Sequence, residues 1–104
     1  MKRRDIVYTP DAANDPDQIY NIIAEASSAV IADRYDSRIR AFCNRLEYGS
    51  ERGTRHDDVR PNLRIIGFES RVAIAFMAEP ERVVILRLFY GGANWSKDFA
   101  EDAD

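Results

Sequence analysis

The sequence of 104 residues contains one cysteine and one histidine, and this scarcity argues against several kinds of site. Cys43 cannot form an internal disulfide, which fits a reducing compartment such as the cytoplasm. It lies in a helical pattern, so we expect a small buried hydrophobe rather than a nucleophile. His56 has no second histidine and no nearby cysteine. We therefore expect no metal site and no cofactor.

Long apolar runs are also lacking, and no stretch approaches the roughly 18 residues of a membrane span. The basic N-terminus has no apolar segment after it, so it does not read as a secretory signal. Repeats and linker-like stretches are missing as well. We expect one cytoplasmic domain over residues 1–104, in which residues 100–104 form a frayed tail.

Lysine is scarce, with 2 residues against 13 arginines, while the net charge is −3. Positions 52 to 71 are rich in arginine, which can bind carboxylate or phosphate through two parallel hydrogen bonds. A solvated face with intramolecular ion pairs explains the same pattern. The negative net charge opposes strong binding of nucleic acid by this chain alone.

Three β-rich runs follow one another between positions 63 and 90. The pattern predicts strands over Leu63–Phe68, Arg71–Ala78 and Arg82–Tyr90, joined by short turns at 69–70 and 79–81. Short connections favour neighbouring antiparallel strands. The second strand is apolar on both faces, so we expect it in the centre of a sheet with a covered face.

The first half of the chain is expected to form the helices that cover one face of that sheet. Residues 5–9 read as a short strand, most simply paired at an edge of the sheet. A helix follows, either with Asp15 as its N-cap or with an earlier start after Thr9 and Pro10 in the first turn. A break at Ala26–Ala29 separates it from a second helix, which ends at Tyr48–Gly49. Apolar residues at helical spacing predict the buried faces: Ile19, Ile22, Ile23 and Ala26, then Ile31, Tyr35, Ile39, Phe42 and Leu46.

Residues 50–62 are polar and rich in turn formers, so we expect a loop there. The predicted fold class is α+β, in the order β-α-α-β-β-β. A helical hairpin packs on a twisted antiparallel sheet.

Three segments resemble a known family. They are DIVYTPDAANDPDQIYNIIAEAS, YDSRIRAFCNRLEYGSERGTRHDDVRPNLRIIGF and RVVILRLFYGGANW. In their joint spacing they are similar to the RelE/ParE superfamily of toxins from bacterial type II toxin–antitoxin modules, and within it to the ParE-like branch. The resemblance covers residues 5–99. It implies a helical hairpin on a twisted sheet, and a cognate antitoxin whose C-terminal segment wraps the toxin.

The two branches of this superfamily imply different activities. RelE-type toxins cleave mRNA in the ribosome, whereas ParE-type toxins act on DNA gyrase and block replication without cleaving RNA. An ungapped comparison of the last strand places the RelE catalytic positions on Ala73, Ala93 and Phe99. None of these side chains can carry charge or transfer a proton, as RNA cleavage requires. The resemblance therefore implies a gyrase-binding toxin that is not an enzyme.

Arginines and aromatic residues are the candidates for contact with the target or the antitoxin. They are Arg55, Arg60, Arg64, Arg71, Arg87, Tyr90, Trp95 and Phe99. Trp95 and Phe99 fit a core or an antitoxin groove better than a stacking platform. Two alternatives stay open. One is a ribosome-dependent mRNA endonuclease with displaced catalytic residues, among Arg55, His56, Arg64 and Arg71. The other is an inactive relative retained for antitoxin binding.

Overall fold

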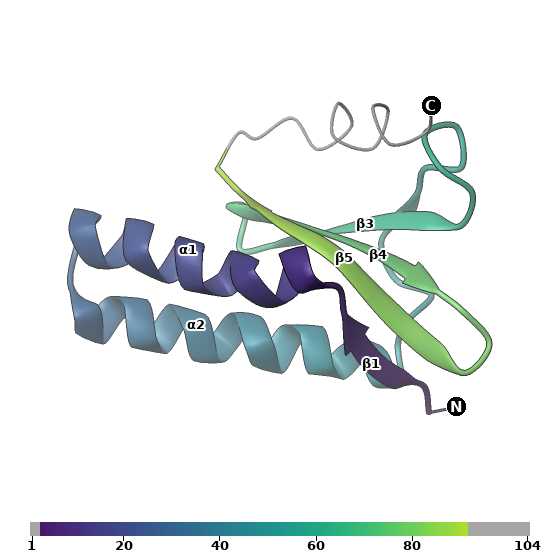
Figure 1. Cartoon of the computed structure of the whole chain (residues 1–104), viewed down its shortest axis with the longest axis horizontal. Helices are drawn as coiled ribbons and strands as arrows, with labels where there is room; N and C mark the ends of the chain where they lie inside the picture. Colours follow the sequence, from purple (N-terminus) through teal and green to yellow (C-terminus); the bar gives the residue numbers. More distant parts are fainter. Residues whose placement is uncertain (1–2, 92–104) are drawn as a thin grey trace.

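The computed structural model describes residues 3–91, which form a helical hairpin packed on one face of a sheet (Figure 1). The helices are α1 (Pro10–Ala26) and α2 (Ala29–Asn44), followed by the short 3-10 helix η1 (Arg45–Glu47). The strands are β1 (Asp5–Tyr8), β2 (Thr54–Arg55), β3 (Leu63–Phe68), β4 (Val72–Ala78) and β5 (Arg82–Tyr90). They form a five-stranded sheet in the order β1-β5-β4-β3-β2. The predicted α+β class and hairpin-on-sheet architecture are confirmed.

The meander β3-β4-β5 is antiparallel, as its short turns predict. Glu69 and Ser70 take left-handed φ angles of 50° and 61° in the first turn, where the Arg71 amide donates to the Phe68 carbonyl. β4 is central, as its apolar character on both faces predicts. β1 lies at the predicted edge, but it runs parallel to β5, so the sheet is mixed rather than wholly antiparallel.

The predicted loop at 50–62 contains the short strand β2, which pairs antiparallel with β3. The expectation of a loop without a strand was wrong at Thr54–Arg55, because two residues are too few to show a period. Gly53 makes the approach possible. Its φ is 82°, and a Cβ there would lie 2.6 Å from the carbonyl oxygen of Ile65.

Helix α1 begins at the earlier of its two predicted starts. The Thr9 hydroxyl accepts a hydrogen bond from the Ala12 amide, and Pro10 occupies the first turn. The alternative N-cap, Asp15, was wrong because this residue lies inside α1 and is 5% exposed. The predicted break between the helices is confirmed, and the Ser28 hydroxyl caps α2. α2 ends at Asn44, and η1 carries the chain to Glu47, one residue before the predicted stop.

The main core lies between the hairpin and the sheet. It joins Ile19, Ile23, Tyr35, Ile39 and Leu46 of the helical layer to Ile74, Phe76, Val83 and Ile85 of the sheet. Cys43 is fully buried there, as predicted, and burial raises the pKa of its thiol to about 11.

Three predicted core residues are exposed instead: Ile22 at 51%, Ile31 at 48%, and Ala26. The closed end of the hairpin extends beyond the sheet, so these positions have no sheet to cover them (Figure 1).

Candidate functional site

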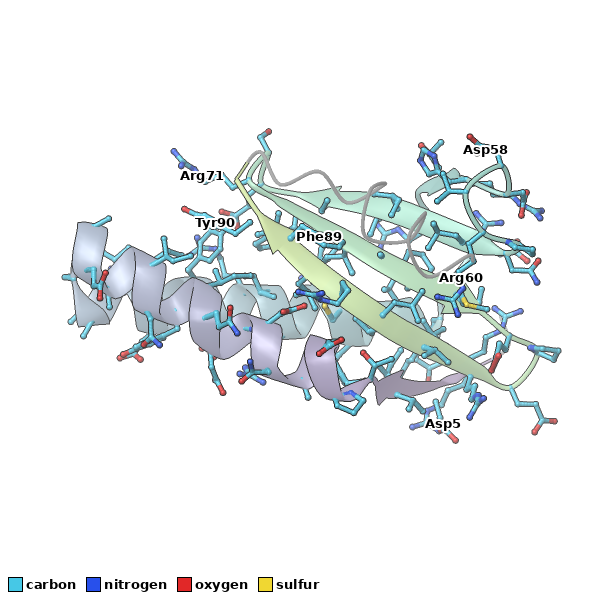
Figure 2. All side chains as sticks on the ribbon, turned by 45° about the horizontal axis from the view of Figure 1, so that its top comes forward. Asp5, Asp58, Arg60, Arg71, Phe89 and Tyr90 are labelled. Atoms are coloured by element: carbon cyan, nitrogen blue, oxygen red, sulfur yellow. The ribbon has the colours of Figure 1, made fainter. Side chains whose placement is uncertain are left out.

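The structure distributes the predicted partner-binding residues over separate parts of the sheet. Arg55 and Arg64 are Cα partners across β2 and β3. Arg71 and Tyr90 lie at the opposite end of the sheet, well apart from Arg60 (Figure 2). Trp95 and Phe99, like Ala93, lie outside the described residues. The predicted set is therefore not a single site.

Two of these arginines line a small cavity together with a third that the sequence analysis did not single out. This arginine cavity has a volume of about 110 Å³. Its lining residues are Arg4, Glu51, Arg55, Asn62, Arg64 and Ala78. No local pattern in the sequence distinguishes Arg4. It joins the cavity because its amide donates to the carbonyl of Glu47, which brings the start of the chain to η1.

The three guanidinium groups are held by different partners. Arg64 Nη1 donates to the Glu51 carbonyl oxygen at 2.9 Å. Arg4 Nη1 donates to the Ser50 hydroxyl, and Ser50 itself is 1% exposed. The Nε of Arg4 is buried and has no hydrogen-bond partner among residues 3–91. The arginines at this cavity are therefore only partly satisfied by the described part of the chain.

Asp57 fixes the position of Arg55. Its carboxylate accepts from Arg55 Nε at 3.0 Å and Nη2 at 3.2 Å, and also from the Asn62 amide at 2.8 Å. The hydrogen bonds from Arg55 contribute most to lowering the pKa of Asp57, and the bond from the Asn62 amide adds to this effect. The arrangement holds the guanidinium beside the cavity before any partner arrives, which reduces the side-chain ordering that binding requires.

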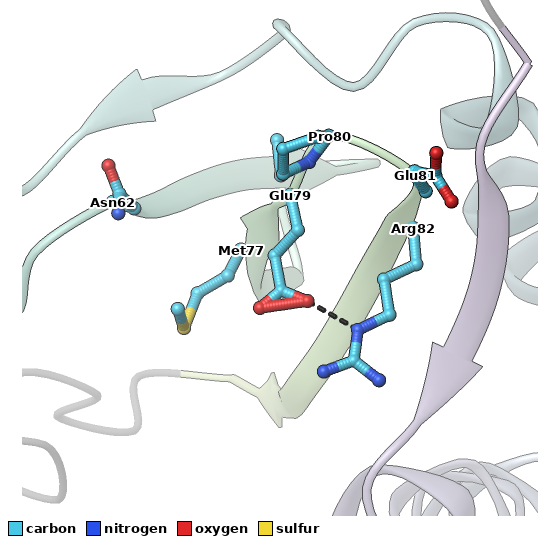
Figure 3. A pocket seen from close by; sticks show the side chains of 7 residues that line it. Asn62, Met77, Glu79, Pro80, Glu81 and Arg82 are labelled. Atoms are coloured by element: carbon cyan, nitrogen blue, oxygen red, sulfur yellow. Dashed lines mark hydrogen bonds and ion pairs between the residues drawn. The ribbon is translucent and has the colours of Figure 1, made fainter.

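A larger hollow adjoins the arginine cavity at the turn between β4 and β5 (Figure 3). This turn hollow has a volume of about 780 Å³, and it shares Asn62 and Ala78 with the arginine cavity. Its other lining residues are Met77, Glu79, Pro80, Glu81 and Arg82. Glu79 and Arg82 form an ion pair across it (Figure 3). A partner segment lying in the turn hollow would pass directly beside the three arginines.

Arg87 forms an ion pair within the fold and so has a structural role. The Asp15 carboxylate accepts from Arg87 Nε at 2.9 Å and Nη2 at 3.2 Å, and from the Leu88 amide at 2.8 Å. The Arg87 guanidinium also lies 5.3 Å from the ring centroid of Phe89. These contacts tie α1 to β5, although 34% of the Arg87 side chain stays exposed.

The displaced ribonuclease site would need Arg55, His56, Arg64 and Arg71 close together. Arg64 stands near the start of β3, while Arg71 follows its end. At about 3.3 Å per residue of strand, this separates them by roughly 15 Å or more along the sheet. The structure therefore brings Arg55 and Arg64 together but leaves Arg71 out.

Ala73, one of the positions of the RelE catalytic pattern, lies on the sheet face opposite the helices. It packs against a second apolar cluster in which Leu63, Ala75 and Phe89 are buried. The other apolar members are Val59, Ile65 and Leu86, and the Arg87 guanidinium lies 5.3 Å from the ring centroid of Phe89 beside them. Within residues 3–91, no three acidic, histidine or cysteine side chains gather as metal ligands would. No helix in the same range is long and apolar enough to span a membrane.

Comparison with known proteins now assigns the family. The model of the family described as "ParE toxin of type II toxin-antitoxin system, parDE" matches residues 6–95. The chain belongs to this family. The resemblance predicted from the sequence is confirmed, and the chain is a toxin of a type II toxin–antitoxin system.

The fold of this ParE toxin is shared with a solved structure described as "Chromosomal ParDE TA system from P. aeruginosa". The TM-score is 0.74 at 20% sequence identity, over 86% of this chain and 97% of the other. No curated protein sequence matches the chain. At this level of identity the solved structure supports the fold, and the roles of individual residues depend on the geometry described above.

Proposed function

We propose that this ParE toxin acts in the cytoplasm by binding DNA gyrase and blocking replication, without catalysing a reaction itself. A cognate antitoxin binds and neutralises it. Family membership supports the toxin role. The gyrase target is the activity that the ParE-like branch implies.

The observation that carries the non-enzymatic part is the environment of Ala73. Cleavage of RNA through its 2′-hydroxyl requires a group that takes or orients a proton and cations that stabilise the phosphate. At Ala73 the sheet instead presents a closely packed apolar cluster.

The arginines are proposed as binding rather than catalytic groups. Arg55 and Arg64 line the arginine cavity, and Arg60 lies in the turn between β2 and β3. Arg71 and Tyr90 mark a second contact region at the far end of the sheet. Arg87 holds Asp15 and stays a candidate for contact with a partner. Trp95 and Phe99 remain candidates for contact with the antitoxin.

The test is a supercoiling assay with purified gyrase and this toxin, scored for relaxed DNA and for trapped cleaved DNA. We expect inhibition that rises with toxin concentration and disappears when the cognate antitoxin is added in equimolar amount. Absence of inhibition at high toxin excess would refute the gyrase target.

A parallel assay with ribosome-bound mRNA separates the alternatives. Cleavage that is lost in His56→Ala or Arg64→Gln would support the endonuclease. Inactivity in both assays, together with tight antitoxin binding, would identify an inactive relative.

A further inference from the structure

The arginine cavity gathers more hydrogen-bond donors than the surrounding chain satisfies. A guanidinium carries five N–H donors. Arg4 and Arg64 each donate to one acceptor within residues 3–91, and the buried Nε of Arg4 donates to none there. Arg55 is better satisfied because Asp57 accepts two of its bonds. We propose that the cavity binds one carboxylate side chain, an Asp or Glu of the antitoxin.

The inference depends on the antitoxin partner of the proposed function, and it deepens that function by naming the chemistry of one contact. It does not depend on gyrase as the target. The antitoxin segment expected here has an acidic residue that enters the arginine cavity. It also has a neighbouring apolar residue that lies over Met77 and Pro80 in the turn hollow.

Charge balance favours a group with a single negative charge. Three guanidinium groups line the cavity and carry three positive charges. Two carboxylates oppose them, that of Glu51 in the lining and that of Asp57, which binds Arg55. One positive charge is left over, which a carboxylate neutralises. The volume of about 110 Å³ is enough for one such group.

The surroundings of the cavity oppose a nucleic acid. A nucleic acid strand brings a continuous row of phosphates, which requires a continuous basic track. The adjoining turn hollow instead presents Glu79 and Glu81 against the single Arg82. Asp57 and Asp58 stand on the loop beside Arg55. A protein segment with a single carboxylate can reach the arginines without placing a row of negative charges against these acidic side chains.

Affinity for the purified cognate antitoxin, measured by titration calorimetry, tests the proposal. Arg64→Gln removes one charge, and the main-chain oxygen that Arg64 contacts stays near solvent, so the fold is spared. We expect affinity to fall by about tenfold or more, the loss typical of a charged hydrogen bond. Arg34→Gln is the matched control, because it removes one charge from an exposed position on α2 that is outside the cavity. It should change affinity by less than about threefold.

The carboxylate is identified by replacing each Asp and Glu of the antitoxin's toxin-binding segment with Ala. One of these changes should weaken binding to the unmodified toxin by about tenfold, yet have little further effect on Arg64→Gln. Arg64→Lys should recover part of the affinity, since it restores the charge but not the planar fork.

Three results would overturn the proposal. The first is equal affinity of Arg64→Gln and Arg34→Gln for the antitoxin. The second is the absence of any acidic antitoxin residue coupled to Arg64. The third is an effect of Arg64→Gln on binding of a single-stranded oligonucleotide with none on the antitoxin, which would assign the cavity to phosphate. Failure of the unmodified toxin to bind the antitoxin would instead refute the antitoxin part of the proposed function.

Discussion

Replacing Asp15 with Ala should be one of the most damaging single changes to this fold. The carboxylate is the acceptor for three hydrogen bonds, two from Arg87 and one from the Leu88 amide. Its loss leaves a buried N–H without an acceptor, at a cost of about 1–3 kcal/mol. It also removes the carboxylate to which the Arg87 guanidinium donates two hydrogen bonds. Breaking a buried pair costs about 3–5 kcal/mol, but Arg87 is 34% exposed, so water replaces part of the lost interaction.

Taken together, these terms predict a loss of roughly 3 kcal/mol in the free energy of unfolding. For a domain of this size, that corresponds to a fall in Tm of about 12 °C. Urea unfolding followed by circular dichroism measures the change, and an unaltered slope would show that the unfolded state is the same. Asp15→Asn keeps an acceptor for the Leu88 amide, so it should lose about half as much.

Asp17→Ala is the control, since it changes the same residue type in the same helix. The Asp17 side chain is 73% exposed, and its oxygen lies 3.6 Å from Arg40. Its removal should cost less than about 0.5 kcal/mol. If Asp15→Ala and Asp17→Ala were equally stable, Asp15 would not hold α1 to β5. The double variant Asp15→Ala with Arg87→Met tests the coupling directly: its loss should be smaller than the sum of the two single losses, because both remove the same ion pair.

Three further predictions concern other elements. Gly53→Ala should destabilise the chain by about 2 kcal/mol in urea unfolding, because the new Cβ would meet the Ile65 carbonyl at 2.6 Å; Gly67→Ala, which meets no atom within 4 Å, should cost far less. Arg38 lowers the pKa of Glu69 from its usual 4.5, so this ion pair stabilises the fold above that pH and is lost as the pH falls through the lowered pKa. Glu69→Gln should therefore lower the Tm at pH 7 but not in strong acid, and an equal decrease at both would contradict the linkage. Cys43, with a thiol pKa of about 11 and no exposed surface, should resist iodoacetamide at pH 8 until urea unfolds the chain, and rapid labelling of the native protein would show that the site opens.

The sequence predicted the sheet better than the site, because strands follow from residues close together in the chain, whereas the site depends on residues far apart in it. Strand boundaries follow from local alternation and from turn residues, so the β3-β4-β5 meander was predicted to within one residue. The start of α1 was a choice between two local signals. Thr9 prevailed because its hydroxyl both caps the helix and donates to the Leu86 carbonyl, a contact between residues far apart in the chain.

The arginine cavity also depends on a contact between residues far apart in the chain. Arg55 and Arg64 face each other across β2 and β3, but Arg4 joins them through the hydrogen bond of its amide to Glu47. Asp15 was misread for a related reason. An aspartate before Pro16 looks like a helix cap, and only the packing of α1 on β5 reveals Arg87 and Leu88 as its partners. Arginine content predicted a basic region, but the geometry decided which arginines share a cavity.

The parallel pairing of β1 with β5 has a consequence for synthesis on the ribosome. Asp5 pairs with Arg82, so the first strand finds its partner only after nearly the whole chain has been made. Pairings between such distant residues form slowly, because the intervening chain must be ordered first. A chain interrupted before β5 leaves α1 without the strand that anchors Asp15, and it should be degraded rather than act. Toxicity then begins only with the finished molecule, which gives an antitoxin made at the same time the interval it needs to bind.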